Sequence, residues 1–343
     1  MHYKLMSIES EFRRLAVSRN LRKTFFNLVD YKASDNGNNI PRFGTPHVPV
    51  GALKSPVINR GTWLRTSSIS MIIDDFMKQN EGENVQILSL GAGNDTRAFE
   101  LLPKYHKTLQ YFELDFPDSC KVKKFTILTD KRLYAKLFVE ASANASQLPT
   151  DYLSFSSSDG KLDSNCYHLI PSDLRKLRKE MIPANFDWTK KTLVLSECCI
   201  CYMGTEESNQ LLEYLRKWLI SGLFVVYEPM GGQETQDSRY GEVMVRNLKT
   251  RGIEMPNLMV YNTIEKQEAR FKGFGIDLKD LVVCDLKFIY YNWIVRNSIM
   301  RISQLEMLDE IEELNLINSH YTLIVASWGN AFNCKLRRQL QQH

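Results

Sequence analysis

The stretch ILSLGAGNDTRAFEL, residues 87–101, joins a short apolar run, a turn with two glycines and the start of a helix-like pattern. Gly91 and Gly93 allow the backbone to turn sharply and to approach a ligand without a Cβ clash. Many α/β proteins bind a nucleotide with this succession of strand, glycine turn and helix. The stretch therefore predicts a nucleotide-binding turn at the carboxyl end of a buried strand.

Short apolar runs alternate with helix-like segments through most of the chain beyond this stretch. The predicted strands are residues 85–90, 109–114, 167–171, 192–197, 223–228, 281–285 and 320–327, with two helical stretches expected across 286–317. Such alternation predicts an α/β fold with a doubly wound, mostly parallel sheet, whose ligand binds at the carboxyl ends of the strands. Two less regular insertions, residues 129–165 and 229–280, interrupt the pattern.

The N-terminal part has a different character. A helix is expected around residues 7–30, a loop rich in Gly, Pro, Asn and Ser over 33–57, and a second helix over 66–79 that starts from a Thr/Ser capping region. We therefore expect an N-terminal arm and linker over 1–57, one large domain over 58–330 and a C-terminal tail over 331–343.

Bulk composition narrows the class of protein. No apolar run reaches the roughly 18 residues of a membrane-spanning helix, and the N-terminus lacks the apolar core of a signal peptide. We therefore expect a cytoplasmic protein without a membrane partner. The net charge of +4 is too small to indicate nucleic-acid binding. Residues 1–60 carry ten Lys/Arg against four Asp/Glu, a net of +6, which fits either a solvated basic helix or a contact with an acidic partner.

Seven cysteines are present, three of them crowded in ECCICYM. An odd number without a secretory signal favours reduced thiols over a disulfide framework. A metal site is not expected, because no paired Cys-X-X-Cys motif or nearby His accompanies Cys198, Cys199 and Cys201.

The residues around the glycine turn indicate which nucleotide is bound. Asp115 closes the next strand, 24 residues beyond Gly91, where a carboxylate can accept hydrogen bonds from both ribose hydroxyls of an adenosine. A dinucleotide motif requires Gly or Ala three residues after the second glycine, but Thr96 occupies that position. Asp95 would repel a pyrophosphate and would suit an ammonium or sulfonium, as in S-adenosylmethionine (SAM). Alternatively, Asp95 caps the following helix.

Two further acids follow predicted strands. Asp173, with the adjacent Leu174, is placed to hold the edge and face of an adenine, although it also suits a helix N-cap. Glu197 ends the strand 192–197, where its carboxylate is placed either beneath a cationic methionine portion or as a buried, hydrogen-bonded group. Four acids at successive strand ends, counting Asp95 and Asp115, predict a binding site.

Six motifs, in order and spacing, resemble the leucine carboxyl methyltransferase family. They are INRGTWLR (58–65), LSLGAGNDT (88–96), YFELDFP (111–117), SDLRKL (172–177), LSECCICYM (195–203) and HYTLIVASWG (320–329). The resemblance covers roughly residues 55–330 and implies a Rossmann-like SAM-dependent methyltransferase with an N-terminal helical lid. Its implied reaction transfers a methyl group to the C-terminal leucine carboxylate of the protein phosphatase 2A catalytic subunit.

Residue by residue, the resemblance carries the family's cofactor contacts onto this sequence. They match Arg65, which would face the SAM carboxylate, and Gly91, Asp115, Asp173, Leu174 and Glu197; Gly93 and Asp95 join them from the reasoning above. Tyr202 and Arg239 match segments on the side where the substrate enters. With Arg65, they are our candidate catalytic donors to the substrate carboxylate. The family's N-terminal lysine has no clear counterpart, with Lys23 and Lys32 as possible stand-ins.

Three other functions compete with this interpretation. A sister family, which methylates the wybutosine nucleoside of tRNA, shares the motifs but carries a C-terminal propeller that would follow the last strand of this chain. A scaffold that keeps the fold without turnover is a second alternative, against which the intact set of strand-end acids argues. Thr96 and the missing third glycine argue against a nicotinamide-dependent oxidoreductase.

Overall fold

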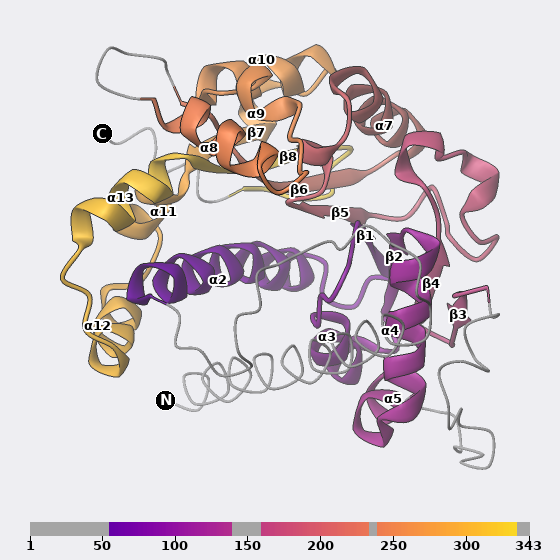
Figure 1. Ribbon diagram of the computed structural model, residues 1–343. Helices are drawn as coiled ribbons and strands as arrows, with labels where there is room; N and C mark the ends of the chain where they lie inside the picture. Colours follow the sequence, from indigo (N-terminus) through magenta and orange to yellow (C-terminus); the bar gives the residue numbers. More distant parts are fainter. Residues whose placement is uncertain (1–54, 139–158, 233–238, 335–343) are drawn as a thin grey trace, which may run out of the picture. The chain divides into compact units, whose positions relative to one another are not determined.

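The computed structural model describes residues 55–138, 159–232 and 239–334 (Figure 1). The chain divides into two compact units, which we call the first and the second unit. The first comprises Met1–Val50 and Asn84–Phe186, and the second comprises Gly51–Glu83 and Asp187–His343. The helix expected around residues 7–30 and its basic arm lie outside the described residues.

In the first unit, helices alternate with strands of a sheet whose order is β3-β4-β2-β1. Strands β1 and β2 pair in parallel, as do β2 and β4, whereas the short β3 is antiparallel to β4. Along the chain the elements are β1 (Val85–Leu90), α3 (Ala98–Tyr105), β2 (Leu109–Asp115), α4 (Pro117–Thr129), α5 (Lys131–Leu137), β3 (Leu162–Asp163), β4 (Tyr167–Pro171), η2 (Leu174–Lys176) and η3 (Lys179–Met181).

The central strands of this unit read as continuous apolar runs because both of their faces are covered. Every residue of β1 is buried, and α3 packs against α5. Proline stands at the start of α4, where its missing N–H costs nothing and its fixed φ suits the first helical turn. In the parallel register, Leu90 lies opposite Leu114 and Asp115 opposite Pro171, so the carboxyl ends of β1, β2 and β4 lie together.

In the second unit, the strand order is β5-β6-β8-β7. Strands β5 and β6 are parallel, and β8 is antiparallel to both of its neighbours, β6 and β7. The elements are α2 (Pro56–Gln79), β5 (Thr192–Glu197), η4 (Ile200–Tyr202), α7 (Thr205–Trp218), β6 (Gly222–Pro229), α8 (Tyr240–Lys249), α9 (Asn257–Val260), α10 (Ile264–Gly273), η5 (Leu278–Asp280), β7 (Leu281–Asp285), α11 (Leu286–Asn292), α12 (Arg296–Leu305), α13 (Ile311–Ser319) and β8 (Tyr321–Trp328).

Helix α2, the long indigo helix of Figure 1, begins ten residues earlier than the sequence predicts. The expected start in the Thr/Ser region near residue 66 is wrong. Pro56 occupies the first helical turn, and the buried face that includes Ile69 and Phe76 continues back through Leu64 to Val57. Because of this, the INRGTWLR motif is helical and presents its last residue from the middle of a helix.

Two further details differ from the predicted pattern. Residues 286–319 form three helices rather than two. The described part of 239–280 is built from α8, α9 and α10 rather than being irregular, and α8 continues the chain directly after the undescribed residues 233–238. The α/β class with parallel strand pairs is confirmed. In the described residues, no helix is both long and apolar enough to cross a membrane.

Candidate functional site

The glycine turn, residues 91–95, connects β1 to α3 in the first unit. Gly91 has a φ of 61° and Gly93 a φ of 47°, a region in which a Cβ is strained. The Gly91 N–H donates to the Leu114 carbonyl at 2.8 Å, and the Asp95 N–H donates to the Ala92 carbonyl at 2.8 Å. A main-chain bond therefore fixes the turn to the end of β2, and the positive φ values favour glycine at both positions.

Asp115 stands beside this turn at the end of β2. One carboxylate oxygen, Oδ2, accepts the Gly93 N–H at 2.6 Å, and Oδ1 accepts the Phe116 N–H at 2.7 Å. The side chain is half-buried. Each carboxylate oxygen can accept more than one hydrogen bond, so both oxygens keep acceptor capacity while the main chain holds them in place. An aligned carboxylate of this kind suits the vicinal hydroxyls of a ribose.

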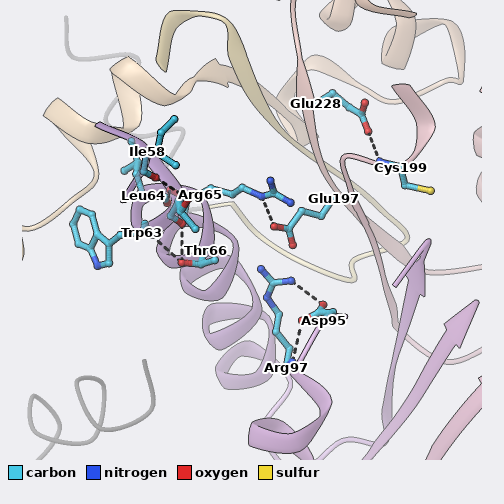
Figure 2. A network of polar contacts seen from close by, with 12 residues as sticks. Ile58, Trp63, Leu64, Arg65, Thr66, Asp95, Arg97, Glu197, Cys199 and Glu228 are labelled. Carbon is cyan, nitrogen blue, oxygen red and sulfur yellow. Dashed lines mark hydrogen bonds and ion pairs between the residues drawn. The ribbon is translucent and has the colours of Figure 1, made fainter. Parts of the chain in front are cut away.

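Asp95 is already paired within the first unit. Its Oδ2 lies 2.8 Å from Arg97 Nη1, and its Oδ1 accepts the Arg97 N–H at 3.0 Å (Figure 2). Burial works to raise the pKa of Asp95, but the charges of Arg97 and Lys123 outweigh it and hold the pKa below its ordinary value. The N-cap of α3 is Arg97 itself, so the capping alternative is wrong in detail. A cofactor role for Asp95 stays a prediction. Its negative charge is already balanced by Arg97 and Lys123.

Asp173 does cap a helix, the short 3₁₀ helix η2. It accepts the Arg175 N–H at 3.1 Å and pairs with the guanidinium at 2.9 Å (Nε) and 2.7 Å (Nη2). These hydrogen bonds lower the pKa of Asp173. The preceding Ser172 donates its N–H to the Asp115 carbonyl at 2.7 Å, and Leu174 is buried. The two candidate adenine residues thus follow the end of β4, which lies beside the end of β2, and Asp173 also serves the capping role.

Arg65 and Glu197 meet within the second unit. Arg65 Nε donates to Glu197 Oε1 in an ion pair whose side chains are 34% and 16% exposed (Figure 2). The guanidinium also lies over the Tyr227 ring, 5.0 Å from its centroid, a cation–π arrangement. Burial works to lower the pKa of Arg65, but the charge of Glu197 outweighs it and raises that pKa.

The ion pair with Glu197 occupies only one of the donors of the Arg65 guanidinium. It uses Nε, and the two Nη groups of a guanidinium carry four further N–H donors in a fixed plane. Planar donors of this kind match a carboxylate. Glu197 is hydrogen-bonded and half-buried at the end of β5, as the structural alternative predicts, while a place beneath a cationic methionine portion stays a prediction. The structure thus brings these two predicted residues together, whereas their roles toward a cofactor stay predictions.

The loop after β5 carries the crowded cysteines. Cys198 has a φ of 49°, an unusual value for a residue with a side chain, and the Cys199 N–H donates to Glu228 Oε1 at 3.3 Å (Figure 2). Burial raises the pKa of Cys198 to about 12, so the thiol stays protonated at neutral pH. All seven cysteines of the chain lie in described regions as free thiols, and the described residues contain no metal-binding cluster.

The two substrate-side candidates differ in setting. Tyr202 ends the 3₁₀ helix η4 and is 48% exposed. Among the large hydrophobic residues of its loop it is the most exposed. Arg239 precedes α8, and its exposed side chain pairs with Glu242, with Nε 3.7 Å from Oε2. Among the described residues, Arg65 pairs with Glu197 and Arg239 with Glu242, so neither forms an ion pair that links the two arginines' positions. The substrate role of Arg239 stays a prediction.

Sequence reasoning missed several residues beside these. Tyr227, under Arg65, stacks on Tyr321 with ring centroids 5.5 Å apart and planes 13° apart. Glu228 is buried, and burial raises its pKa to about 7. The signal for Glu228 was available, since it closes the predicted strand 223–228 just as Glu197 closes 192–197.

The chemistry of these groups fits one cofactor. SAM carries a ribose diol, for which Asp115 in the first unit provides an aligned acceptor. Arg65, in the second unit, provides planar donors for a carboxylate. The glycine turn has the backbone form that admits a close ligand. The class of protein that this fold and these groups define is the SAM-dependent methyltransferase.

Comparison with known proteins gives the family. The model of the leucine carboxyl methyltransferase family matches residues 16–216. Leucine carboxyl methyltransferase 1 of Debaryomyces hansenii is 33% identical over 299 residues, covering 82% of this chain and 78% of that protein. The protein of the same name from Schizosaccharomyces pombe is 34% identical over 281 residues, covering 82% and 84%.

The chain therefore belongs to the leucine carboxyl methyltransferase family. It is an enzyme that uses SAM for carboxyl methylation. Among solved structures, mycolic acid cyclopropane synthase CmaA1 is similar at 11% identity and a TM-score of 0.40, covering 76% of this chain and 82% of that protein.

Proposed function

We propose that the enzyme methylates the C-terminal leucine α-carboxylate of the protein phosphatase 2A catalytic subunit and forms a methyl ester. Membership of the family supports carboxyl methylation, and the motif resemblance adds the phosphatase as acceptor. The single observation that carries the proposal is the Arg65–Glu197 pair, which fixes a planar donor whose Nη groups suit a carboxylate.

A carboxylate needs orientation rather than deprotonation. Its reference pKa of about 3.5 leaves it anionic at neutral pH, so no general base is required. SAM, when bound, supplies an activated methyl group and a neutral thioether leaving group. The protein's part is to align the attacking oxygen and to remove water from it, at a cost that hydrogen-bond donors must offset.

Arg65 suits this task because its position is fixed before any ligand binds. Glu197 holds Nε and the Tyr227 ring lies against the guanidinium, so little side-chain entropy remains to be lost on binding. Opposite charges are consumed in the transfer, and a site that over-stabilised them would slow it. The partial neutralisation of Arg65 by Glu197 is consistent with that requirement. We assign Tyr202, exposed in the adjacent loop, to the substrate side.

We further propose that the first unit recognises the adenosine portion. Asp115 would accept the ribose hydroxyls, while Asp173 and Leu174 would receive the adenine. Support comes from the neighbouring ends of β2 and β4, which place Asp115 beside Ser172, and from a glycine turn whose backbone conformation favours glycine over larger residues.

Partition of a labelled methyl group between acceptors tests the proposal. The full chain is incubated with methyl-labelled SAM, phosphatase 2A catalytic subunit and bulk tRNA together. We expect label in the phosphatase alone, and none in a matched phosphatase that lacks only its terminal leucine. Label in tRNA would assign the chain to wybutosine methylation instead. SAM binding without transfer to either acceptor would indicate a cofactor-binding scaffold.

A further inference from the structure

The first unit contains a fully buried ion pair that the reaction does not use. Lys123 Nζ, on α4, lies 2.5 Å from Glu113 Oε2, on β2, and the two side chains are 2% and 0% exposed. The Tyr167 hydroxyl donates to the same Glu113 oxygen at 2.8 Å. Glu113 neighbours the strand end that carries Asp115, so this network lies directly behind the proposed ribose contact.

The pair is poorly explained by stability alone. Burying two charges costs several kcal/mol each, and apolar side chains of similar size are often as stable or more stable. Within the described part of the chain, Glu113 Oε1 is buried without a hydrogen-bond partner, which adds to that cost. Because the buried pair costs free energy, we look for an interaction that two apolar side chains could not make.

The ammonium of Lys123 makes one such interaction, with the glycine turn. Its Nζ also donates to the backbone carbonyl of Asp95, at 2.9 Å. The glycine turn is thereby held from three sides, because Gly91 bonds the Leu114 carbonyl and Gly93 bonds the Asp115 carboxylate. Two of these supports come from the end of β2, and Lys123 supplies the third from α4.

We propose that Lys123, held in place by Glu113, is a positioning residue that fixes the glycine turn for cofactor binding. The inference deepens the proposed function, since it rests on SAM as the ligand of this turn. A donor with charge suits the task because its hydrogen bond to a carbonyl is about twice as strong as that of a neutral group. Asp95 then contributes through its backbone carbonyl, whatever its side chain does.

Four variants separate positioning from stability. Lys123→Met removes the ammonium and leaves Glu113 buried without its partner, so both stability and SAM affinity should fall. The double variant Lys123→Met/Glu113→Gln removes both charges at nearly constant volume, so most of the lost stability should return. Its SAM dissociation constant, by calorimetry, should nonetheless stay roughly tenfold above that of the wild type, because the bond to the turn is still missing.

Tyr167→Phe is the matched control. It removes a buried hydrogen bond of Glu113 but leaves the contact between Lys123 and Asp95 intact. We expect lower stability in urea unfolding with unchanged SAM affinity. Glu113→Gln alone keeps the bond to Asp95 but strands the ammonium, and it should lose stability more than affinity.

The outcomes decide between the roles. If SAM affinity follows stability through all four variants and recovers in the double variant, Lys123 is structural and the proposal is overturned. The readout is cofactor binding, so a wrong choice of acceptor leaves it valid. A wild-type chain that bound no SAM would instead overturn the cofactor assignment and this inference with it.

Discussion

The carboxyl end of β2 in the first unit and that of β5 in the second unit hold their candidate site residues in different ways. At the β2 end, Asp115 and the glycine turn are held by main-chain bonds and by a buried ammonium. At the β5 end, the central contact is between two side chains, Arg65 and Glu197, of which Arg65 is one-third exposed. The first arrangement is rigid through its backbone, whereas the second keeps its groups accessible.

The difference has a functional reason. A nucleotide has the same shape at every turnover, so a preformed backbone cradle binds it with little entropic cost. An acceptor carboxylate must be received, desolvated and released as a neutral ester, which calls for donors that are positioned without being sealed in. The expected effects of mutation therefore divide between turnover at β5 and cofactor affinity at β2.

Loss of the guanidinium should give the largest effect. Arg65→Met should lower kcat/KM for methyl transfer roughly a hundredfold or more, in line with the removal of one transition-state donor. Arg65→Lys keeps the charge but not the planar donors, so it should recover little of the activity. Steady-state kinetics check both variants. Full activity in Arg65→Lys would mean that charge alone matters and that the planar arrangement does not.

Replacement of the ribose acceptor should have the next largest effect. Asp115→Ala should raise the SAM dissociation constant roughly thirtyfold, because it removes the proposed bonds to the diol and the support of the Gly93 N–H. Asp115→Asn, nearly identical in shape, separates the loss of charge from the loss of volume. Unchanged affinity in calorimetry of Asp115→Ala would refute the ribose assignment.

The buried carboxyl at the end of β6 should make stability depend on pH. Burial raises the pKa of Glu228 from 4.5 to about 7, so the folded state keeps a proton that the unfolded state loses near pH 4.5. The folded state therefore has its full advantage below pH 4.5 and loses it as the pH rises through 7. The shift corresponds to at most about 3 kcal/mol of unfolding free energy.

Glu228→Gln tests that dependence directly. Relative to the wild type, the variant should gain about 2 kcal/mol in unfolding free energy between pH 5 and pH 8, because the wild type loses most of this stabilisation within that range and a glutamine does not titrate. Urea unfolding at both pH values gives the comparison. A difference between the two proteins that does not change with pH would show that Glu228 is ionised across this range.

The smallest effect on catalysis is expected from the exposed residues on the substrate side, Tyr202 and Arg239. Tyr202→Phe should raise the KM for the phosphatase a few-fold, with SAM affinity unchanged, because a single hydroxyl on a half-exposed side chain contributes little net free energy. Arg239→Ala, at a separate exposed position, is the companion variant. A large fall in kcat for Tyr202→Phe would move this tyrosine from substrate contact to the reacting atoms.

Much of this arrangement can be predicted from sequence because it depends on local patterns. Buried strands appear as apolar runs, and residues that close them, such as Asp115 and Glu197, fall at the same edge of their sheets. The Asp-X-Arg spacing also foretells local pairs: Asp95 with Arg97 and Asp173 with Arg175. The charge balance at both acids is thus a local feature of the sequence, although the pattern of strand ends alone does not predict it.

Long-range contacts are harder to predict. Lysine is rarely buried, and nothing near Lys123 in the sequence indicates that it reaches Glu113 and the Asp95 carbonyl. The start of α2 is hard to predict because the Thr/Ser run near residue 66 resembles a helix cap, whereas the helix begins at Pro56. The contact between Tyr227 and Arg65 cannot be predicted locally, because an aromatic residue in an apolar strand has the pattern of core packing.

Mass spectrometry of the phosphatase C-terminal peptide after reaction with SAM tests the central claim most directly. We predict a gain equal to one methyl group on the terminal leucine, removed by mild base as expected for an ester. A methyl group on any other residue, or one that resists base, would contradict carboxyl methylation of that leucine.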